Sequence, residues 1–338
     1  MKHAALVGGG LVKNGIFDLT SPANRDNCLE PYASLRAKFC EYGIDLSTSD
    51  MIGDKEIAFE LHQNVRRSGR NVWAYLLLFE TSVVRPANAS ITAYASYRKI
   101  FTWNDDLVDG QRFIKLNAPN PLTVPVADGF ANRDRFCCLI AANKAVKKHD
   151  PRELYSERIR TIRWFERNAP GDFDLYGIDW DLPPSSVGSL GRIKKRLWRY
   201  IIPVLGLRPF PSYRGRISQK RQVLQRARFS ICYENVRDFP GYITEKIFDC
   251  FFAGCVPVYW GANNIYNHIP ANCFIDRRQF ADESALYSYL REMDEARYLV
   301  YQKNIVSFLG SAAAIPFGSD GFAEIVVSTI LQDLQRSN

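Results

Sequence analysis

The stretch Ile231–Gly261, ICYENVRDFPGYITEKIFDCFFAGCVPVYWG, decides the fold. An apolar run ends at Glu234 and Asn235, and a polar loop follows it. An aromatic-rich segment then ends at Gly254 and leads into a second apolar run, which stops at Gly261. The apolar residues of the middle segment recur at helical spacing, so the stretch predicts a strand, a loop, a helix and a second strand. This order is typical of one unit of a parallel α/β sheet.

The same alternation continues on both sides of this stretch. Short apolar runs are expected to be buried parallel strands, and segments with helical spacing are expected to be crossover helices. We expect strands at 3–9, 72–80, 96–104, 135–144, 172–180 and 255–261, helices at 56–70, 150–168, 244–254, 282–293 and 321–337, and a helix passing into a strand over 218–235. The predicted fold class is therefore α/β, with two Rossmann-like domains.

The length of 338 residues suits two domains better than one core. We expect residues 1–130 to form the N-terminal domain and residues 131–310 to form the C-terminal domain. Residues 311–338 are expected to form a C-terminal helix that crosses back onto the first domain. The composition, with 46% apolar and 24% charged residues, is that of an ordinary soluble globular protein.

Positive charge is concentrated in one segment. The net charge is +8, and residues 182–233 contain twelve Lys and Arg residues and no acid. Such a block attracts phosphate groups, nucleic acid or an anionic membrane surface, although a solvated basic linker has the same composition. The part at 191–211 mixes aromatic and aliphatic residues with cations, which suits a peripheral membrane contact, but a structural linker is the interpretation that we prefer.

The cysteines and histidines indicate a reducing cellular compartment and argue against a zinc site. The eight cysteines include no Cys-x-x-Cys pair, and the four histidines lie far apart without metal-ligand spacing. The first residues do not resemble a secretory signal, and no apolar run approaches the roughly 18 residues of a spanning helix. We therefore expect reduced thiols and a cytoplasmic location, either free or peripheral on the inner face of the cytoplasmic membrane.

The quoted stretch brings polar groups to one edge of the predicted sheet. In doubly wound sheets, ligands bind beyond the carboxyl ends of the strands. Glu234 and Asn235 end one strand, and Tyr242, Glu245 and Lys246 lie where the next helix begins. A helix amino end and a lysine suit a diphosphate, and a carboxylate can accept hydrogen bonds from a ribose. Each residue alone would be read as structural, so the prediction rests on their coincidence.

The motif Tyr-Glu-Asn, a short loop, Tyr-x-Thr-Glu-Lys, then Gly-x-Val-Pro-Val and a closing glycine resembles the signature of glycosyltransferase family 10, the α1,3/α1,4-fucosyltransferases. The resemblance runs roughly from Tyr75 to Phe322 and includes FTWNDDLVD, LYSERIRTIRWFE and DFDLYGIDW, which are similar to bacterial members. It implies a GT-B fold, in which an acceptor-binding N-terminal domain and a donor-binding C-terminal domain face each other across a cleft. It also implies inverting transfer of L-fucose from GDP-β-L-fucose to an acceptor hydroxyl.

The resemblance assigns roles residue by residue. Glu245 would hold the ribose, other residues would hold the diphosphate and sugar, and Glu234 would orient the fucose or the loop. An arginine on the helix after the first strand of the second domain would neutralise the β-phosphate; Arg158 matches it, with Arg160 and Arg163 as rivals. Lys220, with Arg214 and Arg216 as alternatives, would also reach the diphosphate. The predicted donor-binding residues are Arg158, Lys220, Glu234, Asn235, Tyr242, Glu245 and Lys246.

An inverting displacement needs a base that takes the acceptor proton. Glu80 comes directly after the apolar residues of the expected strand at 72–80, and the resemblance makes it the catalytic base. Asp105, Asp106 and Asp109 are rival carboxylates with a structural or acceptor-binding role. We expect no essential cofactor or metal, with a divalent ion at most stimulating transfer, because Asp172–Asp174 and Asp179–Asp181 match a metal-binding Asp-x-Asp pair only superficially.

Other functions stay open at this point. A transferase using another nucleotide sugar shares the same donor chemistry, and an inactive lectin-like relative shares the same fold. A basic nucleic-acid-binding protein would explain the charge block, but the sequence contains no RNA-recognition aromatic pattern, KH loop or zinc knuckle, so no nucleic-acid partner is expected. The predicted acceptor is N-acetylglucosamine in a lipopolysaccharide-type or lactosamine-type glycan. The sequence does not decide the linkage or the oligomeric state.

Overall fold

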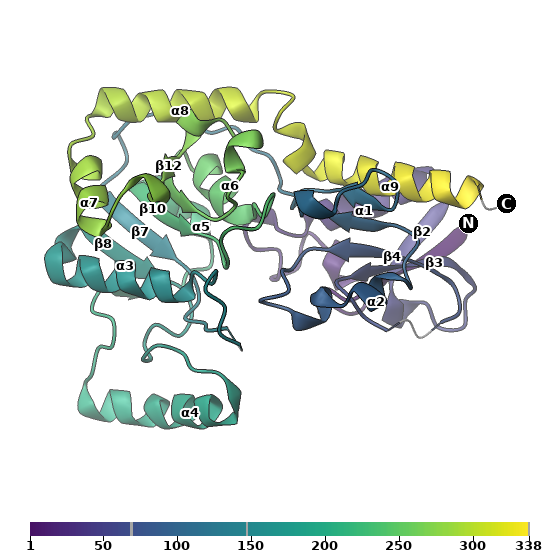
Figure 1. The fold of residues 1–338 in the computed structure, drawn as a ribbon, viewed down its shortest axis with the longest axis horizontal. Coiled ribbons are helices and arrows are strands. Elements are labelled where there is room, and N and C mark those ends of the chain that lie inside the picture. Colours follow the sequence, from purple (N-terminus) through teal and green to yellow (C-terminus); the bar gives the residue numbers. More distant parts are fainter. Residues whose placement is uncertain (68–69, 147, 337–338) are drawn as a thin grey trace. The chain divides into compact units, whose positions relative to one another are not determined.

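The computed structural model describes residues 1–67, 70–146 and 148–336 (Figure 1). Its internal contacts divide the chain into two compact units. Unit 1 comprises Met1–Thr123, Pro240–Glu245 and Ser311–Asn338. Unit 2 comprises Val124–Phe239 and Lys246–Gly310. A short piece of the central sequence and the whole C-terminal segment therefore belong with the N-terminal part of the chain.

Unit 1 is built on a parallel sheet with the strand order β2-β1-β3-β4-β5-β6. The strands are β1 (Lys2–Val7), β2 (Ile44–Thr48), β3 (Ile57–Gln63), β4 (Trp73–Leu78), β5 (Ile100–Thr102) and β6 (Phe113–Lys115). The helices are α1 (Glu30–Glu41), α2 (Ile91–Tyr94) and α9 (Ser319–Gln335). A parallel sheet needs both faces covered, which explains the near-continuous apolar runs of β1 and β4.

Helix α9 completes the core of unit 1. Phe322, Val326 and Ile330 of α9 are buried in one cluster with Leu35 and Phe39 of α1. The Ser319 hydroxyl also donates to the Glu30 carboxylate at the start of α1. The two helices therefore close the same side of the sheet, although their sequences are far apart (Figure 1).

Unit 2 is built on a second parallel sheet with the order β12-β11-β10-β7-β8-β9. The strands are β7 (Arg135–Ile140), β8 (Phe173–Tyr176), β9 (Tyr213–Gly215), β10 (Ala227–Tyr233), β11 (Val256–Trp260) and β12 (Ile275–Asp276). The helices are α3 (Tyr155–Asn168), α4 (Gly188–Leu205), α5 (Lys220–Arg226), α6 (Glu245–Phe252), α7 (Glu283–Arg291) and α8 (Glu295–Leu309). Strand β10 lies between β7 and β11, with Phe229 opposite Cys137 and Val256.

The predicted helix at 56–70 is wrong, because the structure forms β3 over Ile57–Gln63; residues 68–69 of that prediction lie outside the described part. The strand is almost entirely buried between β1 and β4. Its buried polar residues Glu60 and His62 hydrogen-bond inside the unit. The His62 ring lies 2.8 Å from the Glu60 carboxylate through Nε2 and 3.1 Å from the Tyr97 hydroxyl through Nδ1.

Two further elements differ from the sequence interpretation. The segment interpreted as a structural linker contains α4, an 18-residue helix that ends at Gly206 in the left-handed conformation. Helix α3 begins at Tyr155, several residues after the predicted start. The reason is local: the Glu153 carboxylate accepts hydrogen bonds from the backbone N–H groups of Tyr155 (2.8 Å) and Ser156 (3.1 Å), which satisfies donors of the first turn.

Candidate functional site

The carboxyl end of β10 carries Glu234 and Asn235, as predicted from the end of the apolar run. Arg158 of α3 lies against both residues and is 4% exposed. Its Nη2 donates to the carbonyls of Tyr233 (2.6 Å) and Glu234 (2.8 Å) and to the Asn235 side-chain oxygen (3.2 Å). One guanidinium thus fixes the backbone and the amide at the point where the strand ends.

Arg158 is distinct from its two sequence rivals. Arg160 is exposed and pairs with Glu157 on the surface of α3. Arg163 pairs with Glu166, donates to the Pro209 carbonyl at 2.7 Å and lies over the Phe210 ring. Within the described part of α3, Arg158 is therefore the arginine that contacts the end of β10.

Glu234 is fully buried and forms an ion pair with Lys246. The Lys246 Nζ lies 3.1 Å from Glu234 Oε2, and the lysine is itself partly exposed. The pair joins the end of β10 to the first turn of α6, where free N–H groups and the helix dipole favour an anion. A buried carboxylate holds the ammonium in place, and the exposed part of that ammonium can still meet a ligand.

Gly261 explains the closing glycine of the motif. A Cβ placed on Gly261 would lie 2.4 Å from the Tyr259 hydroxyl and 2.5 Å from Glu234 Cγ. Non-bonded contacts of a Cβ atom are essentially never this short, so a larger residue at this position would displace the Glu234 side chain. The glycine therefore creates the space in which the buried carboxylate lies.

The loop before α6 packs with unit 1. The Tyr242 ring centroid lies 4.8 Å from that of Trp103, and Tyr242 is 2% exposed. The Asp105 backbone N–H donates to the Pro240 carbonyl at 3.2 Å, and a Cβ on Gly241 would lie 2.3 Å from the Trp103 carbonyl oxygen. Glu245, the first residue of α6, is exposed. The donor-binding roles of Tyr242 and Glu245 stay predictions.

Lys220 begins α5 and is engaged by an acid. Its Nζ donates to Asp249 Oδ2 of α6 at 2.6 Å, so the charge of Lys220 is partly compensated. Arg214 donates to Asp174 at 2.6 Å, and Arg216 lies 3.7 Å from Asp179. All three cations therefore have an acidic neighbour in unit 2, and their proposed contact with phosphate stays a prediction.

Glu80 follows β4 in unit 1, and its backbone is held by two asparagines. Asn64 Oδ1 accepts from the Glu80 N–H at 2.9 Å, and the Asn88 amide donates to the Glu80 carbonyl at 2.7 Å. The two asparagine side chains also bond to each other at 2.8 Å. Sequence reasoning missed both asparagines, because Asn64 lies inside the segment predicted as a helix at 56–70 and Asn88 is distant from Glu80 in any local pattern.

The rival carboxylates have structural partners. Asp105 pairs with Lys115 at 2.5 Å, and burial lowers the pKa of that lysine. Asp109 accepts three backbone N–H groups of the loop before β6, and these bonds hold its pKa below the usual value. Asp106 is exposed. The bonds of Asp105 and Asp109 suit a structural role, and the structural or acceptor-binding role of the three carboxylates stays a prediction.

The Asp-x-Asp triplets are used in ion pairs and hydrogen bonds. Asp172 accepts from Tyr287 at 2.6 Å, Asp174 pairs with Arg214, and Asp179 pairs with Lys195. Across residues 1–67, 70–146 and 148–336, no group of three or more His, Cys, Asp or Glu side chains has the arrangement of a metal site.

Residues 206–304 match the family model described as glycosyltransferase family 10 (fucosyltransferase), C-terminal part. We call this segment, which is similar to the C-terminal part of that family, the family 10 segment. It contains β10, the loop, α6 and β11, and thus Glu234, Asn235, Glu245, Lys246 and Gly261. The family 10 segment therefore coincides with the ion pair and the helix amino end described above.

Curated relatives align with a short part of the chain. The α-(1,3)-fucosyltransferase FucT of Helicobacter pylori is 28% identical over 75 residues, which is 22% of this chain and 16% of that protein. The mouse 4-galactosyl-N-acetylglucosaminide 3-α-L-fucosyltransferase 9 is 41% identical over 78 residues, or 22% of this chain and 21% of its own length. The alignments thus span 16% and 21% of these two relatives.

Solved structures share the fold over nearly the whole chain. An α1,3-fucosyltransferase crystallised with GDP superposes with a TM-score of 0.53 and 12% identity, covering 98% of this chain and 91% of the other. Sucrose-phosphate synthase from Thermosynechococcus elongatus gives a TM-score of 0.58 and 12% identity, with complete coverage of both chains. Two parallel α/β units, as in these GT-B glycosyltransferases, confirm the predicted fold class outside the family 10 segment as well.

Proposed function

We propose that the protein is an inverting fucosyltransferase that moves L-fucose from GDP-β-L-fucose to a hydroxyl of a glycan acceptor. The observation that carries the proposal is the Glu234–Lys246 ion pair at the first turn of α6, inside the family 10 segment. A helix amino end with a lysine in its first turn suits a nucleotide diphosphate. The match of this segment to the fucosyltransferase model supports fucose as the transferred sugar.

In the proposed reaction, the acceptor oxygen attacks C1 of fucose from the face opposite the diphosphate. The C1–oxygen bond to the β-phosphate breaks, and its electron pair leaves with GDP. Glu80 takes the acceptor proton as the new C–O bond forms. Lys246 and Arg158 stabilise the negative charge that develops on the departing phosphate, with the helix amino end as a further source of positive potential.

Asn64 and Asn88 position the base in this proposal. They hydrogen-bond to the N–H and the carbonyl of Glu80. These bonds fix the backbone after β4 and thereby the direction in which the Glu80 side chain points. Glu245 accepts hydrogen bonds from the ribose, and Asn235, oriented by Arg158, binds the sugar or phosphate. We propose that transfer needs no metal and no resident cofactor, because cationic side chains are available where phosphate charge develops.

Donor choice tests the proposal. The protein is incubated with GDP-fucose, GDP-mannose, UDP-glucose or UDP-galactose, with N-acetyllactosamine and its β1,3-linked isomer as acceptors, with and without EDTA. Transfer from GDP-fucose alone, unaffected by EDTA, is expected, and the preferred acceptor assigns α1,3 or α1,4 linkage to N-acetylglucosamine. Turnover with a UDP-sugar or GDP-mannose and none with GDP-fucose would contradict the assignment.

The base is tested separately. Glu80→Gln should lower kcat by about 10²–10⁴-fold, the usual contribution of a general base, with little change in GDP affinity. Asp106→Asn is the matched control, because this carboxylate is also in unit 1 and is exposed. Equal activity of Glu80→Gln and the wild type would remove Glu80 from the reaction without affecting the donor assignment.

A further inference from the structure

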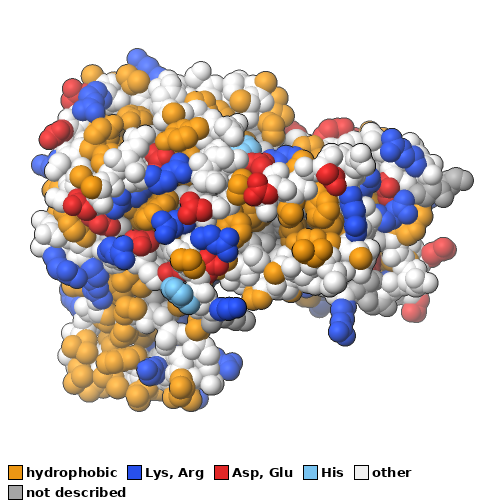
Figure 2. Space-filling view, viewed as in Figure 1, with side chains coloured by type: hydrophobic (Ala, Val, Ile, Leu, Met, Phe, Trp, Pro, Cys, Tyr) orange, Lys and Arg blue, Asp and Glu red, His pale blue; other side chains and the backbone are white. Residues whose placement is uncertain are grey.

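Helix α4, Gly188–Leu205, presents an apolar face to solvent. Figure 2 shows hydrophobic side chains gathered over this helix, at the lower edge of the view. The side chains of the apolar face are between 56% and 83% exposed: Leu190, Ile193, Leu197, Tyr200 and Val204. Soluble proteins rarely leave a contiguous apolar patch of this kind without a partner.

The apolar residues form one stripe. At about 100° per residue, Leu190, Ile193, Leu197, Tyr200 and Val204 fall within roughly 80° of arc around the helix axis. Lys194 and Arg196 lie on either side of this stripe and are exposed. The arrangement is an apolar centre bordered by cations along the whole helix.

The opposite face attaches α4 to unit 2. Lys195 and Arg199 pair with Asp179, and by the same helical spacing they lie more than about 130° from the centre of the stripe. Gly191 fits tightly against the Ser186 carbonyl, where a Cβ would lie 2.3 Å away, and Ile202 is buried. The helix is thus fastened by the side that faces away from the stripe, and the stripe points outward.

A cationic groove runs beside the stripe. It has a volume of about 580 Å³ and is lined by Arg192, Lys195, Arg196, Arg199 and Tyr200. Lys195 and Arg199 already pair with Asp179, so Arg192 and Arg196 are the cations of this groove that suit the phosphate of a lipid headgroup. Apolar side chains next to it would meet the acyl chains of the same lipid.

An apolar helix face can be covered by a second copy of the chain or by a lipid surface, and the charges of α4 favour the lipid surface. The helix carries five cations, Arg192, Lys194, Lys195, Arg196 and Arg199, and no acid. A second copy packed through the stripe would place the bordering cations Lys194 and Arg196 of one helix against those of the other, which disfavours a helix pair. An anionic lipid surface supplies both the missing negative charge and an apolar layer.

We propose that α4 lies in the interface of an anionic membrane, with its apolar stripe in the acyl boundary and its cations at the headgroups. At about 1.5 Å per residue, the helix is roughly 27 Å long and lies flat on the surface. None of the helices in the described part of the chain is long and apolar enough to cross a membrane. Helix α4 contains none of the residues assigned to the proposed transfer reaction, so the membrane contact and the reaction can be tested separately.

Vesicle sedimentation tests the proposal with the full chain. One set of vesicles contains equal parts of phosphatidylcholine and phosphatidylglycerol, and the other contains phosphatidylcholine alone. The wild type should sediment with the first set and much less with the second. Ile193→Glu/Leu197→Glu should abolish sedimentation, and Val300→Glu, at an equally exposed apolar position of α8, should leave it unchanged.

Removing charge should weaken binding by a predictable amount. Each cation near an anionic surface contributes about fivefold, so Lys194→Gln/Arg196→Gln should weaken binding roughly twenty-fivefold. Lys2→Gln/Lys303→Gln removes the same net charge from exposed positions elsewhere and should retain wild-type binding. Far-ultraviolet circular dichroism confirms that each variant is folded.

Three results would overturn the proposal. The first is a wild type that sediments with neither vesicle set. The second is equal sedimentation by the wild type and Ile193→Glu/Leu197→Glu. The third is a wild-type dimer in solution that this double variant converts to a monomer, which would assign the stripe to a second copy. Fucose transfer to a soluble acceptor should be the same for the double variant and the wild type, which separates membrane binding from the proposed activity.

Discussion

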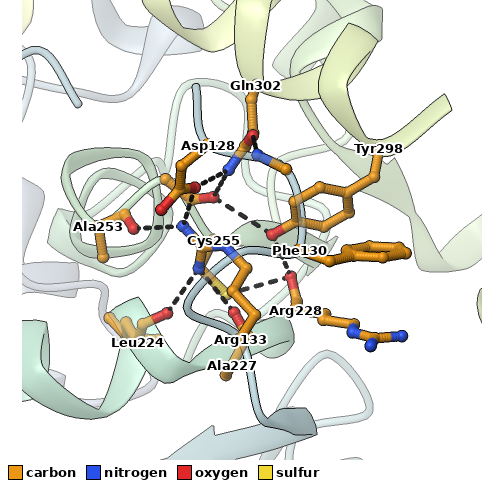
Figure 3. Close-up of polar contacts among 12 residues, drawn as sticks. Asp128, Phe130, Arg133, Leu224, Ala227, Arg228, Ala253, Cys255, Tyr298 and Gln302 are labelled. Carbon is orange, nitrogen blue, oxygen red and sulfur yellow. Dashed lines mark hydrogen bonds and ion pairs between the residues drawn. The ribbon is translucent and has the colours of Figure 1, made fainter. Parts of the chain in front are cut away.

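Arg133 offers the clearest test of how unit 2 holds α6. It lies just before β7 and is 4% exposed. Figure 3 shows its guanidinium surrounded by backbone carbonyls: Nη1 donates to Leu224 (3.1 Å) and Ala227 (2.8 Å), and Nη2 donates to Ala253 (2.9 Å). Asp128 Oδ1, at 3.3 Å from Nη2, adds a carboxylate. The arginine thus satisfies the carbonyl ends of both α5 and α6.

The neighbours of Arg133 extend the same cluster. Gln302 donates to Asp128 at 3.0 Å and to the Gly254 carbonyl at 2.9 Å, and the Tyr298 hydroxyl donates to the Arg228 carbonyl at 2.8 Å (Figure 3). The carboxyl end of α6 is therefore fixed from α8 as well. Because the amino end of the same helix carries Lys246, this cluster anchors the helix that presents the proposed diphosphate site.

Arg133→Leu should destabilise unit 2 by about 3–5 kcal/mol, the usual loss when one partner of a buried ionic cluster is removed. Three bonds to buried carbonyls disappear, and a hydrogen bond to a charged group contributes roughly 1.5–3 kcal/mol each. The three hydrogen bonds and the ion pair are not additive, because one guanidinium makes all of them. The expected destabilisation is therefore that of the buried cluster and not the sum of the separate hydrogen bonds. Arg133→Lys should fall between the wild type and Arg133→Leu, since an ammonium keeps the charge but cannot span all three carbonyls.

Guanidinium unfolding followed by circular dichroism measures the effect as a change in the free energy of unfolding. Arg135→Leu is the matched control, because Arg135 is two residues away, is half exposed, and lies 3.8 Å from the exposed Asp134 and 3.6 Å from Asp174, which keeps Arg214 as a closer partner. Its loss should be below about 1 kcal/mol. Equal decreases in the free energy of unfolding for Arg133→Leu and Arg135→Leu would show that the carbonyls find other donors. That result would refute the role of Arg133 in holding the ends of α5 and α6.

Three other perturbations have defined outcomes. Gly261→Ala should lower donor affinity and destabilise the chain by about 1–3 kcal/mol, the usual range for overpacking, because its Cβ would collide with Glu234; calorimetric titration with GDP and thermal unfolding measure both effects. Tyr242→Ala should destabilise unit 1 by about 3–5 kcal/mol through loss of ring packing on Trp103, while Tyr242→Phe should keep stability and lower donor affinity only if the hydroxyl binds the donor. Iodoacetamide at pH 8 should label Cys28 and Cys40 quickly and Cys273 only slowly, because burial raises the pKa of the Cys273 thiol to about 12; mass spectrometry locates the label, and the slow reaction should accelerate as the pH rises.

Each of these predictions has a control. Gly171→Ala should be close to wild type, since a Cβ there meets no atom within 4 Å. A stable Tyr242→Ala variant would show that the ring contact with Trp103 contributes little. Rapid labelling of Cys273 in the native protein would contradict the buried state of its thiol, whereas labelling after unfolding is expected.

Much of both sheets could be predicted from the sequence because several of their strands are mainly apolar. The runs that became β4, β7, β10 and β11 are buried on both faces, so local composition and tertiary environment agree. The prediction failed at β3, where Glu60 and His62 are polar but pair with each other inside the unit. Composition cannot show that two polar side chains will satisfy one another.

Residues of the candidate site could likewise be predicted where the signal is local in the sequence, and not where it depends on tertiary contacts. Glu234, Asn235 and Lys246 could be placed because strand ends and helix starts are local features of the sequence. Choosing Arg158 over Arg160 required the tertiary contact with the end of β10, which α3 periodicity alone does not identify. The partnership of Tyr242 with Trp103, and the support of Glu80 by Asn64 and Asn88, join residues distant in sequence, and no local pattern predicts them.

The assignment of Ser311–Asn338 to unit 1 has a consequence for synthesis on the ribosome. Helix α9 supplies Phe322, Val326 and Ile330 to a core whose other residues are translated some two hundred residues earlier or more. The unit translated first must therefore wait for the last helix to emerge, while unit 2 has all of its own residues once Gly310 has been made. Nascent chains that stop near Gly310 should hold a folded unit 2 beside an incomplete, protease-sensitive unit 1, which reverses the usual amino-to-carboxyl order of domain folding.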